Sequence, residues 1–172
     1  MEKPEDSRDF FEVSKEFGAI REHPARVIFR QVVESCAQLH SHGVLHRDIK
    51  DENILVNLKT LETKIIDFGC ATDFCPDTEY ETFSGTPEFC APEIFTTGKY
   101  RGESSTVWTL GTLLYVILIG DIPFDKDIDI TQGRIRDTVS ISIKKINQYL
   151  LVLNFSWRLS LRFSNIKNTC LL

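Results

Sequence analysis

The sequence has few cysteines, and none of them lies in a metal-binding pattern. The number of cysteines is odd, and no CxxC pair or spacing typical of zinc ligands occurs. This absence argues against a zinc module and against a disulfide framework. We therefore expect a reduced chain in the cytoplasm, and also in the nucleus. The five cysteines are Cys36, Cys70, Cys75, Cys90 and Cys170.

Long apolar segments are also absent. The first ten residues are rich in charged side chains, where a signal peptide would need an apolar core. The longest apolar run, residues 110–119, is too short to span a bilayer and contains Gly111, so it predicts a buried helix. We expect neither secretion nor a membrane partner.

Positive charge is scarce in most of the chain. A net charge of -5 argues against a nucleic-acid partner, which would normally require a basic patch. Residues 67–93 contain seven acidic residues and no Lys or Arg, whereas residues 131–172 contain seven Lys or Arg and only one acid, Asp137. Because the composition changes there, we predict a main domain over residues 1–130 and a diverged tail of the same domain over residues 131–172.

The sequence does contain one segment with apolar side chains at helical spacing, followed by short apolar runs. Between His23 and His42, apolar side chains recur at the spacing of one buried helical face, and Gly43 follows as a stop. Two longer segments follow from the same reading: a surface segment over residues 69–92, and a second helix over residues 105–119 that ends at Gly120. Brief strands are predicted at residues 44–45, 54–56 and 64–66. This pattern favours an α+β fold that is mainly α.

The chemistry is concentrated in three motifs. HRDIKDEN occupies residues 46–53, DFG occupies residues 67–69, and APE occupies residues 91–93. Phosphoryl transfer needs a carboxylate to orient the attacking hydroxyl, a cation beside the phosphate that moves, and oxygen ligands for magnesium. The first two motifs supply all three. A single motif would be weak, because exposed Asp and Lys side chains are usually only solvated, but the combination in this order is specific.

Together these motifs resemble the protein kinase signature HRDxKxxN, DFG and APE. The resemblance implies that Asp48 is the catalytic base, that Lys50 neutralises charge on the transferred phosphate, and that Asn53 and Asp67 hold Mg²⁺ beside ATP. Thr86 lies where serine/threonine kinases keep a threonine near the catalytic aspartate, which favours serine or threonine over tyrosine as the acceptor. An ordinary turn threonine is the alternative for Thr86.

For other residues in and near the motifs, we predict structural or regulatory roles. We expect His46 and Phe68 to pack beneath the site, and not to act as a base or a metal ligand. In the family, the arginine at the position of Arg47 often docks a phosphate on the segment after DFG, but the acids of that segment could order it without phosphorylation. The candidate phosphate acceptors on this segment are Thr78, Thr82 and Ser84.

Among protein kinases, the sequence resembles the Pim family. The resemblance is carried by HRDIKDENILV at residues 46–56, by Val-Trp at residues 107–108 in place of the usual Asp-Trp, and by GDIPF at residues 120–124. Glu2-Lys3-Pro4 is similar to the hinge between the kinase lobes, where the proline lacks the backbone N–H usually offered to adenine. Glu2 is therefore assigned to the ATP site. The resemblance implies a serine/threonine protein kinase that uses ATP and Mg²⁺.

The Pim resemblance also implies a class of substrate. Pim kinases prefer proteins with arginines before the acceptor, and Asp9, Glu12 and Glu52 align with the acids that read these arginines. Carboxylates pair bidentately with guanidinium groups, so the chemistry is reasonable. For Asp9 and Glu12 a solvated acidic face is an equal alternative, whereas Glu52 is the better candidate because it lies inside HRDIKDEN.

The resemblance begins at the hinge, so the sequence predicts a kinase large lobe that lacks the small lobe with its glycine-rich loop and strand lysine. In the tail, Phe163 and Ile166 stand where the family has a proline and an arginine. Two hypotheses remain open. One is a Pim-like kinase, and the other is a catalytically inactive kinase fragment that acts only as a binding module. The oligomeric state is unknown from the sequence.

Overall fold

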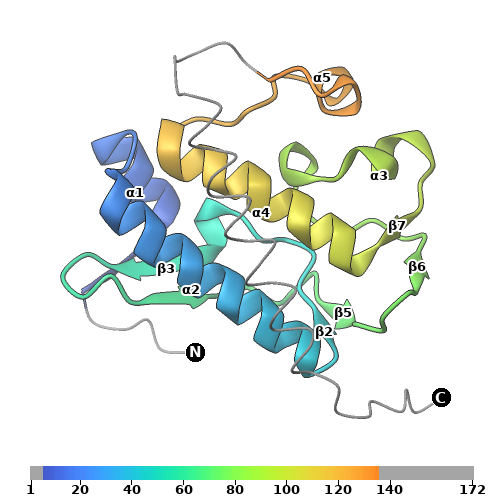
Figure 1. Cartoon of the computed structure of the whole chain (residues 1–172), viewed down its shortest axis with the longest axis horizontal. Helices are drawn as coiled ribbons and strands as arrows, with labels where there is room; N and C mark the ends of the chain where they lie inside the picture. Colours follow the sequence, from blue (N-terminus) through green and yellow to red (C-terminus); the bar gives the residue numbers. More distant parts are fainter. Residues whose placement is uncertain (1–5, 136–172) are drawn as a thin grey trace.

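The computed structural model describes residues 6–135. Two long helices pack against each other, and short strands and turns surround them (Figure 1). The mainly helical α+β prediction is confirmed. The elements in chain order are β1 (Ser7–Asp9), α1 (Phe10–Phe17), α2 (Glu22–Ser41), β2 (Val44–Leu45), η1 (Asp51–Asn53), β3 (Ile54–Asn57), β4 (Thr63–Ile65), β5 (Thr72–Asp73), β6 (Glu79–Tyr80), η2 (Pro87–Phe89), α3 (Pro92–Thr96), β7 (Tyr100–Arg101), α4 (Gly102–Ile119) and α5 (Asp127–Gln132).

The first long helix, α2, forms because its apolar side chains repeat at helical spacing. Ile28, Phe29 and Val32 are buried on one face and belong to the main core. After the helix ends, Gly43 has a φ of 73°, a left-handed conformation that glycine adopts without strain. The helix predicted over residues 23–42 is confirmed, with a shift of one residue at each end.

The second long helix, α4, supplies the other side of the core. Leu113, Leu114 and Ile117 are almost fully buried. The helix predicted over residues 105–119 is confirmed, although it begins earlier, at Gly102. In the described part of the chain, α4 is long and apolar enough to cross a membrane, but a buried core helix meets the same criteria. Its buried face in this structure agrees with a core helix.

A three-stranded antiparallel sheet brings two of the motifs together. Its order is β1-β3-β4. β3 follows HRDIKDEN and β4 precedes DFG, and because Ile54 pairs with Ile65, both motifs lie at the same end of the sheet. The sequence does not predict β1, because Ser7–Asp9 is polar; it forms through backbone pairing with β3. Asp9 then caps α1 by accepting the Glu12 N–H at 2.8 Å.

The segment over residues 69–92 contains more structure than a plain surface loop. Within it, β5 pairs with β2, and β6 pairs with β7 beyond it. The rings of Tyr80 and Tyr100 stack with centroids 5.5 Å apart, and the Tyr80 hydroxyl donates to the carbonyl of Asp73. The segment is therefore held against the body of the fold. The domain boundary predicted at residue 131 stays a prediction, and Phe163 and Ile166 lie outside the described residues.

Candidate active site

The loop over residues 46–53, named the HRD loop here, runs from β2 into η1. Arg47 and Asp67 have φ values of 69° and 59°, which are uncommon for residues other than glycine and are concentrated at functional sites. Gly85 has a φ of 135°, and a Cβ atom on it would overlap the carbonyl oxygen of Arg47. Glycine at this position therefore lets the following residue, Thr86, approach the HRD loop closely.

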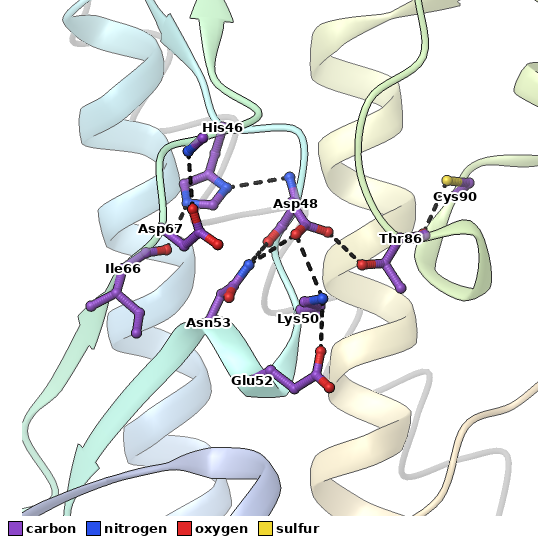
Figure 2. Close-up of polar contacts among 10 residues, drawn as sticks. His46, Asp48, Lys50, Glu52, Asn53, Ile66, Asp67, Thr86 and Cys90 are labelled. Carbon is purple, nitrogen blue, oxygen red and sulfur yellow. Dashed lines mark hydrogen bonds and ion pairs between the residues drawn. The ribbon is translucent and has the colours of Figure 1, made fainter.

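Asp48 lies at the centre of a network of polar contacts (Figure 2). The Thr86 hydroxyl donates to Asp48 Oδ1 at 2.7 Å, and the Asn53 amide donates to Asp48 Oδ2 at 3.0 Å and to the Asp48 carbonyl at 2.8 Å. Lys50 Nζ lies 3.7 Å from Asp48 Oδ2. The side chain of Asp48 is only 11% exposed, so these contacts hold the carboxylate in one orientation.

Lys50 lies between two carboxylates. Its Nζ atom is 2.7 Å from Glu52 Oε2, closer than to Asp48. Burial lowers the pKa of Lys50, but the hydrogen bond to Glu52 and the charges of Asp48 and Glu52 outweigh burial, so the pKa is raised. Lys50 therefore remains a cation beside Asp48 at neutral pH.

His46 connects the HRD loop to the strand before DFG. Its Nε2 atom lies 3.1 Å from the Ile66 carbonyl, and its Nδ1 accepts the Asp48 N–H at 3.3 Å, which assigns the proton to Nε2. Burial lowers the pKa of His46, although the bond to Ile66 and the charges of Asp48 and Asp67 oppose this effect. A neutral, buried His46 agrees with the predicted packing role.

The prediction for Phe68 is wrong in one respect. Its ring contacts His46 with centroids 4.8 Å apart, but the side chain is 40% exposed and is not buried beneath the site. The left-handed backbone of Asp67 precedes Phe68, and a motif cannot reveal which way the chain turns there. The phenylalanine of the DFG motif therefore lies at the surface.

The oxygens expected to hold Mg²⁺ lie on the same side of the site. Asn53 uses its NH₂ group to reach Asp48, which leaves its carbonyl Oδ1 with no partner in residues 6–135. Asp67 accepts the Gly69 N–H on Oδ1 at 3.1 Å, and Figure 2 shows the side chains of Asp67 and Asn53 pointing toward one another. Hard oxygens of this kind fit Mg²⁺, which needs few protein ligands when phosphates supply the others. The described residues contain no group of three or more His, Cys, Asp or Glu side chains placed to hold a metal.

The three residues expected to read arginine line one open depression. Asp9, Glu12 and Glu52 border it from β1, α1 and η1, Lys15 of α1 lies on its border too, and its volume is about 670 Å³. Arg8 also borders the depression. Its Nη1 atom lies 2.6 Å from Glu16 Oε2, and its Nε atom lies 3.7 Å from Glu12 Oε2. Glu2, assigned to the ATP site, lies outside the described residues.

Arg47 contacts backbone carbonyls of the segment after DFG. Its Nε donates to the Cys70 carbonyl at 2.5 Å, and its Nη1 donates to the Thr82 carbonyl at 3.2 Å. The Tyr100 hydroxyl donates to the same Thr82 carbonyl at 3.1 Å. Arg47 therefore holds the segment after DFG through two backbone contacts.

A thiol also contacts the backbone of Thr86, and the sequence does not predict this contact. Cys90 donates from Sγ to the Thr86 carbonyl at 3.1 Å. Burial, together with the nearby charge of Asp48, raises the pKa of Cys90 to about 12, so the thiol stays neutral and can donate. No sequence signal distinguishes this cysteine from the others, because its contact depends on the turn at η2.

Comparison with known proteins defines the class to which this site belongs. The family model described as protein kinase domain matches residues 1–169, and the chain belongs to the protein kinase family. The chain is also Pim-like, as its sequence predicted. It is 44% identical over 134 residues to the serine/threonine-protein kinase pim-2 of Danio rerio, and 44% identical over 130 residues to the serine/threonine-protein kinase prk-2 of Caenorhabditis elegans.

A less similar relative is also named as a serine/threonine-protein kinase. The PAS domain-containing serine/threonine-protein kinase of Mus musculus is 40% identical over 124 residues. The three alignments cover 78%, 76% and 72% of this chain, and 43%, 29% and 9% of the respective relatives. The chain therefore spans less than half the length of these relatives.

Proposed function

We propose that the chain carries the phosphate-transfer site of a serine/threonine protein kinase that acts on ATP and a protein hydroxyl group. The observation that carries this proposal is the Asp48 carboxylate, which contacts Thr86, Asn53 and Lys50 at 2.7, 3.0 and 3.7 Å. Such contacts orient a carboxylate toward an incoming hydroxyl and keep a cation beside it.

The proposed reaction transfers the γ-phosphate without a covalent enzyme intermediate. Asp48 accepts the proton of the serine or threonine hydroxyl while the hydroxyl oxygen forms a bond to the γ-phosphorus. The bond from this phosphorus to the oxygen that bridges the β- and γ-phosphates breaks, and ADP leaves. Lys50 offsets negative charge near Asp48, and Thr86 holds Oδ1 in place.

Asn53 and Asp67 are the residues that would hold Mg²⁺, through Oδ1 of the amide and the carboxylate of the DFG motif. When bound, the ion would neutralise charge on the phosphates. We assign Glu2 to the adenine side of the ATP site, on the resemblance to the Pim hinge. These assignments rest on the motifs and on the donor chemistry described above.

The proposed protein substrates have arginines near the acceptor serine or threonine. This preference is supported by the depression bordered by Asp9, Glu12 and Glu52, because carboxylates bind guanidinium groups in a bidentate geometry. We also propose a cytoplasmic location, nuclear in part, with neither a nucleic-acid nor a membrane partner. These proposals follow the cysteine pattern and the charge of the sequence.

A second candidate function is a binding module for basic segments without phosphate transfer. It is favoured by the same acidic depression, which could bind arginine even if no phosphate moved. The two candidates differ in their dependence on ATP and in their choice of acceptor residue.

The test is to incubate the purified chain with radiolabelled ATP, Mg²⁺ and four matched arginine-rich peptides that differ only in carrying serine, threonine, alanine or tyrosine at the acceptor position. We expect label on the serine and threonine peptides and none on the alanine peptide. A peptide with tyrosine as its only acceptor should remain unlabelled. Binding of all four peptides with no label on any of them would favour the binding module.

A further inference from the structure

Lys50 contacts two carboxylates that differ in their exposure, those of Asp48 and Glu52. Its side chain is only 18% exposed, and its ammonium group lies 2.7 Å from Glu52 and 3.7 Å from Asp48. The shorter contact is to the more exposed acid, because the side chain of Glu52 is 51% exposed and that of Asp48 is 11% exposed. Lys50 is therefore closer to the outer carboxylate, and Figure 2 shows both contacts.

Glu52 also borders the acidic depression together with Asp9 and Glu12. It lies in η1, which packs against α1, so its backbone is held while its carboxylate stays accessible from the depression. One face of this carboxylate thus meets Lys50, and the other side is open to an incoming group.

A guanidinium group and Lys50 would compete for Glu52. A bidentate arginine uses both carboxylate oxygens and places a second positive charge next to the ammonium group, which repels it. Lys50 has another acceptor close by, because Asp48 Oδ2 is 3.7 Å away and already lies within the reach of the side chain. The exchange therefore requires a rotation of the Lys50 side chain and no movement of the backbone.

We propose that Glu52 is a positioning residue that exchanges partners: it holds Lys50 in the absence of substrate, and a substrate arginine displaces Lys50 toward Asp48. This inference rests on the proposed preference for arginine. It couples recognition of the basic segment to the placement of the cation beside the Asp48 carboxylate. A peptide without arginine would bind without moving Lys50.

The exchange can be measured on the chain itself by following the side-chain ammonium resonances of its lysines in NMR spectra at constant pH. Lys50→Arg assigns the Lys50 signal, and Lys59, which pairs with Asp6 at 2.6 Å, is an internal reference. The probe is an arginine-rich peptide with alanine at the acceptor position. A matched peptide carries citrulline, which has nearly the same shape and no charge, in place of each arginine.

We expect the arginine peptide to move the Lys50 signal toward its position in the Glu52→Gln variant and to leave Lys59 unchanged. In Glu52→Gln itself, the peptide should cause no further movement, whereas Glu34→Gln, which removes a surface acid paired with Arg30, should behave as the unchanged chain. If the arginine peptide binds and Lys50 does not move, the exchange is wrong and the substrate proposal stands. If the arginine and citrulline peptides bind equally, the exchange and the proposed preference for arginine are both wrong.

Discussion

Acidification should destabilise the fold through His40. This side chain is 4% exposed, stacks on Phe74 with ring centroids 4.0 Å apart, and lies 3.3 Å from the Thr106 hydroxyl of α4. Burial lowers the pKa of His40 from 6.5 to about 4. The folded protein therefore binds this proton less tightly than the unfolded chain does.

The sign and size of the effect follow from this difference. The stability that neutral His40 gives to the folded state is fully present well above pH 6.5. It is lost as the pH falls from 6.5 toward 4, because only the unfolded chain gains the proton in that window. A difference of this size corresponds to about 3 kcal/mol in total and to about 2 kcal/mol at a pH of about 5. His46, whose pKa burial also lowers, adds to the loss in the same direction.

Urea unfolding at neutral pH and at a pH of about 5 measures this loss. We expect His40→Phe, which keeps an aromatic ring on Phe74, to reduce the pH dependence of the free energy of unfolding by about 2 kcal/mol. Val107→Ala, at an exposed position on α4 that carries no titratable group, is the control and should leave the pH dependence unchanged. An identical pH dependence in His40→Phe and the unchanged chain would refute the reasoning.

Three further predictions concern the site. Gly85→Ala should lower the free energy of unfolding in urea by roughly 2 kcal/mol or more. Gly98→Ala, also at a positive φ but with no neighbour within 4 Å, should cost only the backbone strain, so equal losses would contradict the close approach to Arg47. Thr86→Val should slow peptide phosphorylation roughly tenfold or more, with Thr86→Ser close to normal; an unaffected rate would remove the role of the 2.7 Å contact. Arg8→Gln should tighten binding of an arginine-rich peptide roughly two- to fivefold in fluorescence anisotropy, because Arg8 already occupies Glu12 and Glu16. Weaker binding would show that Arg8 is not a competitor.

The sequence predicts those elements whose cause is local. The buried face of α2 repeats at helical spacing, and the apolar residues of α4 precede Gly120, which has a φ of 80°. Both helices are accordingly found where they were predicted. The three motifs predicted the kinase family, which the comparisons confirm.

Features that depend on distant contacts could not be predicted in this way. β1 is polar and forms only because β3 offers backbone partners, and the exposure of Phe68 follows from a left-handed turn at Asp67. The contacts of Glu52 with Lys50 and of Cys90 with Thr86 depend on the turns at η1 and η2.

The most direct test compares phosphate transfer to an arginine-rich serine peptide by the unchanged chain and by its Asp48→Asn variant. Asparagine keeps the size of the side chain and removes its capacity to accept a proton, and urea unfolding of both proteins checks that the variant is folded. We predict ATP-dependent labelling of serine by the unchanged chain, and a rate lower by roughly two orders of magnitude or more in Asp48→Asn. Equal labelling by both proteins would contradict the assignment of Asp48, and no labelling by the unchanged chain would contradict its proposed activity.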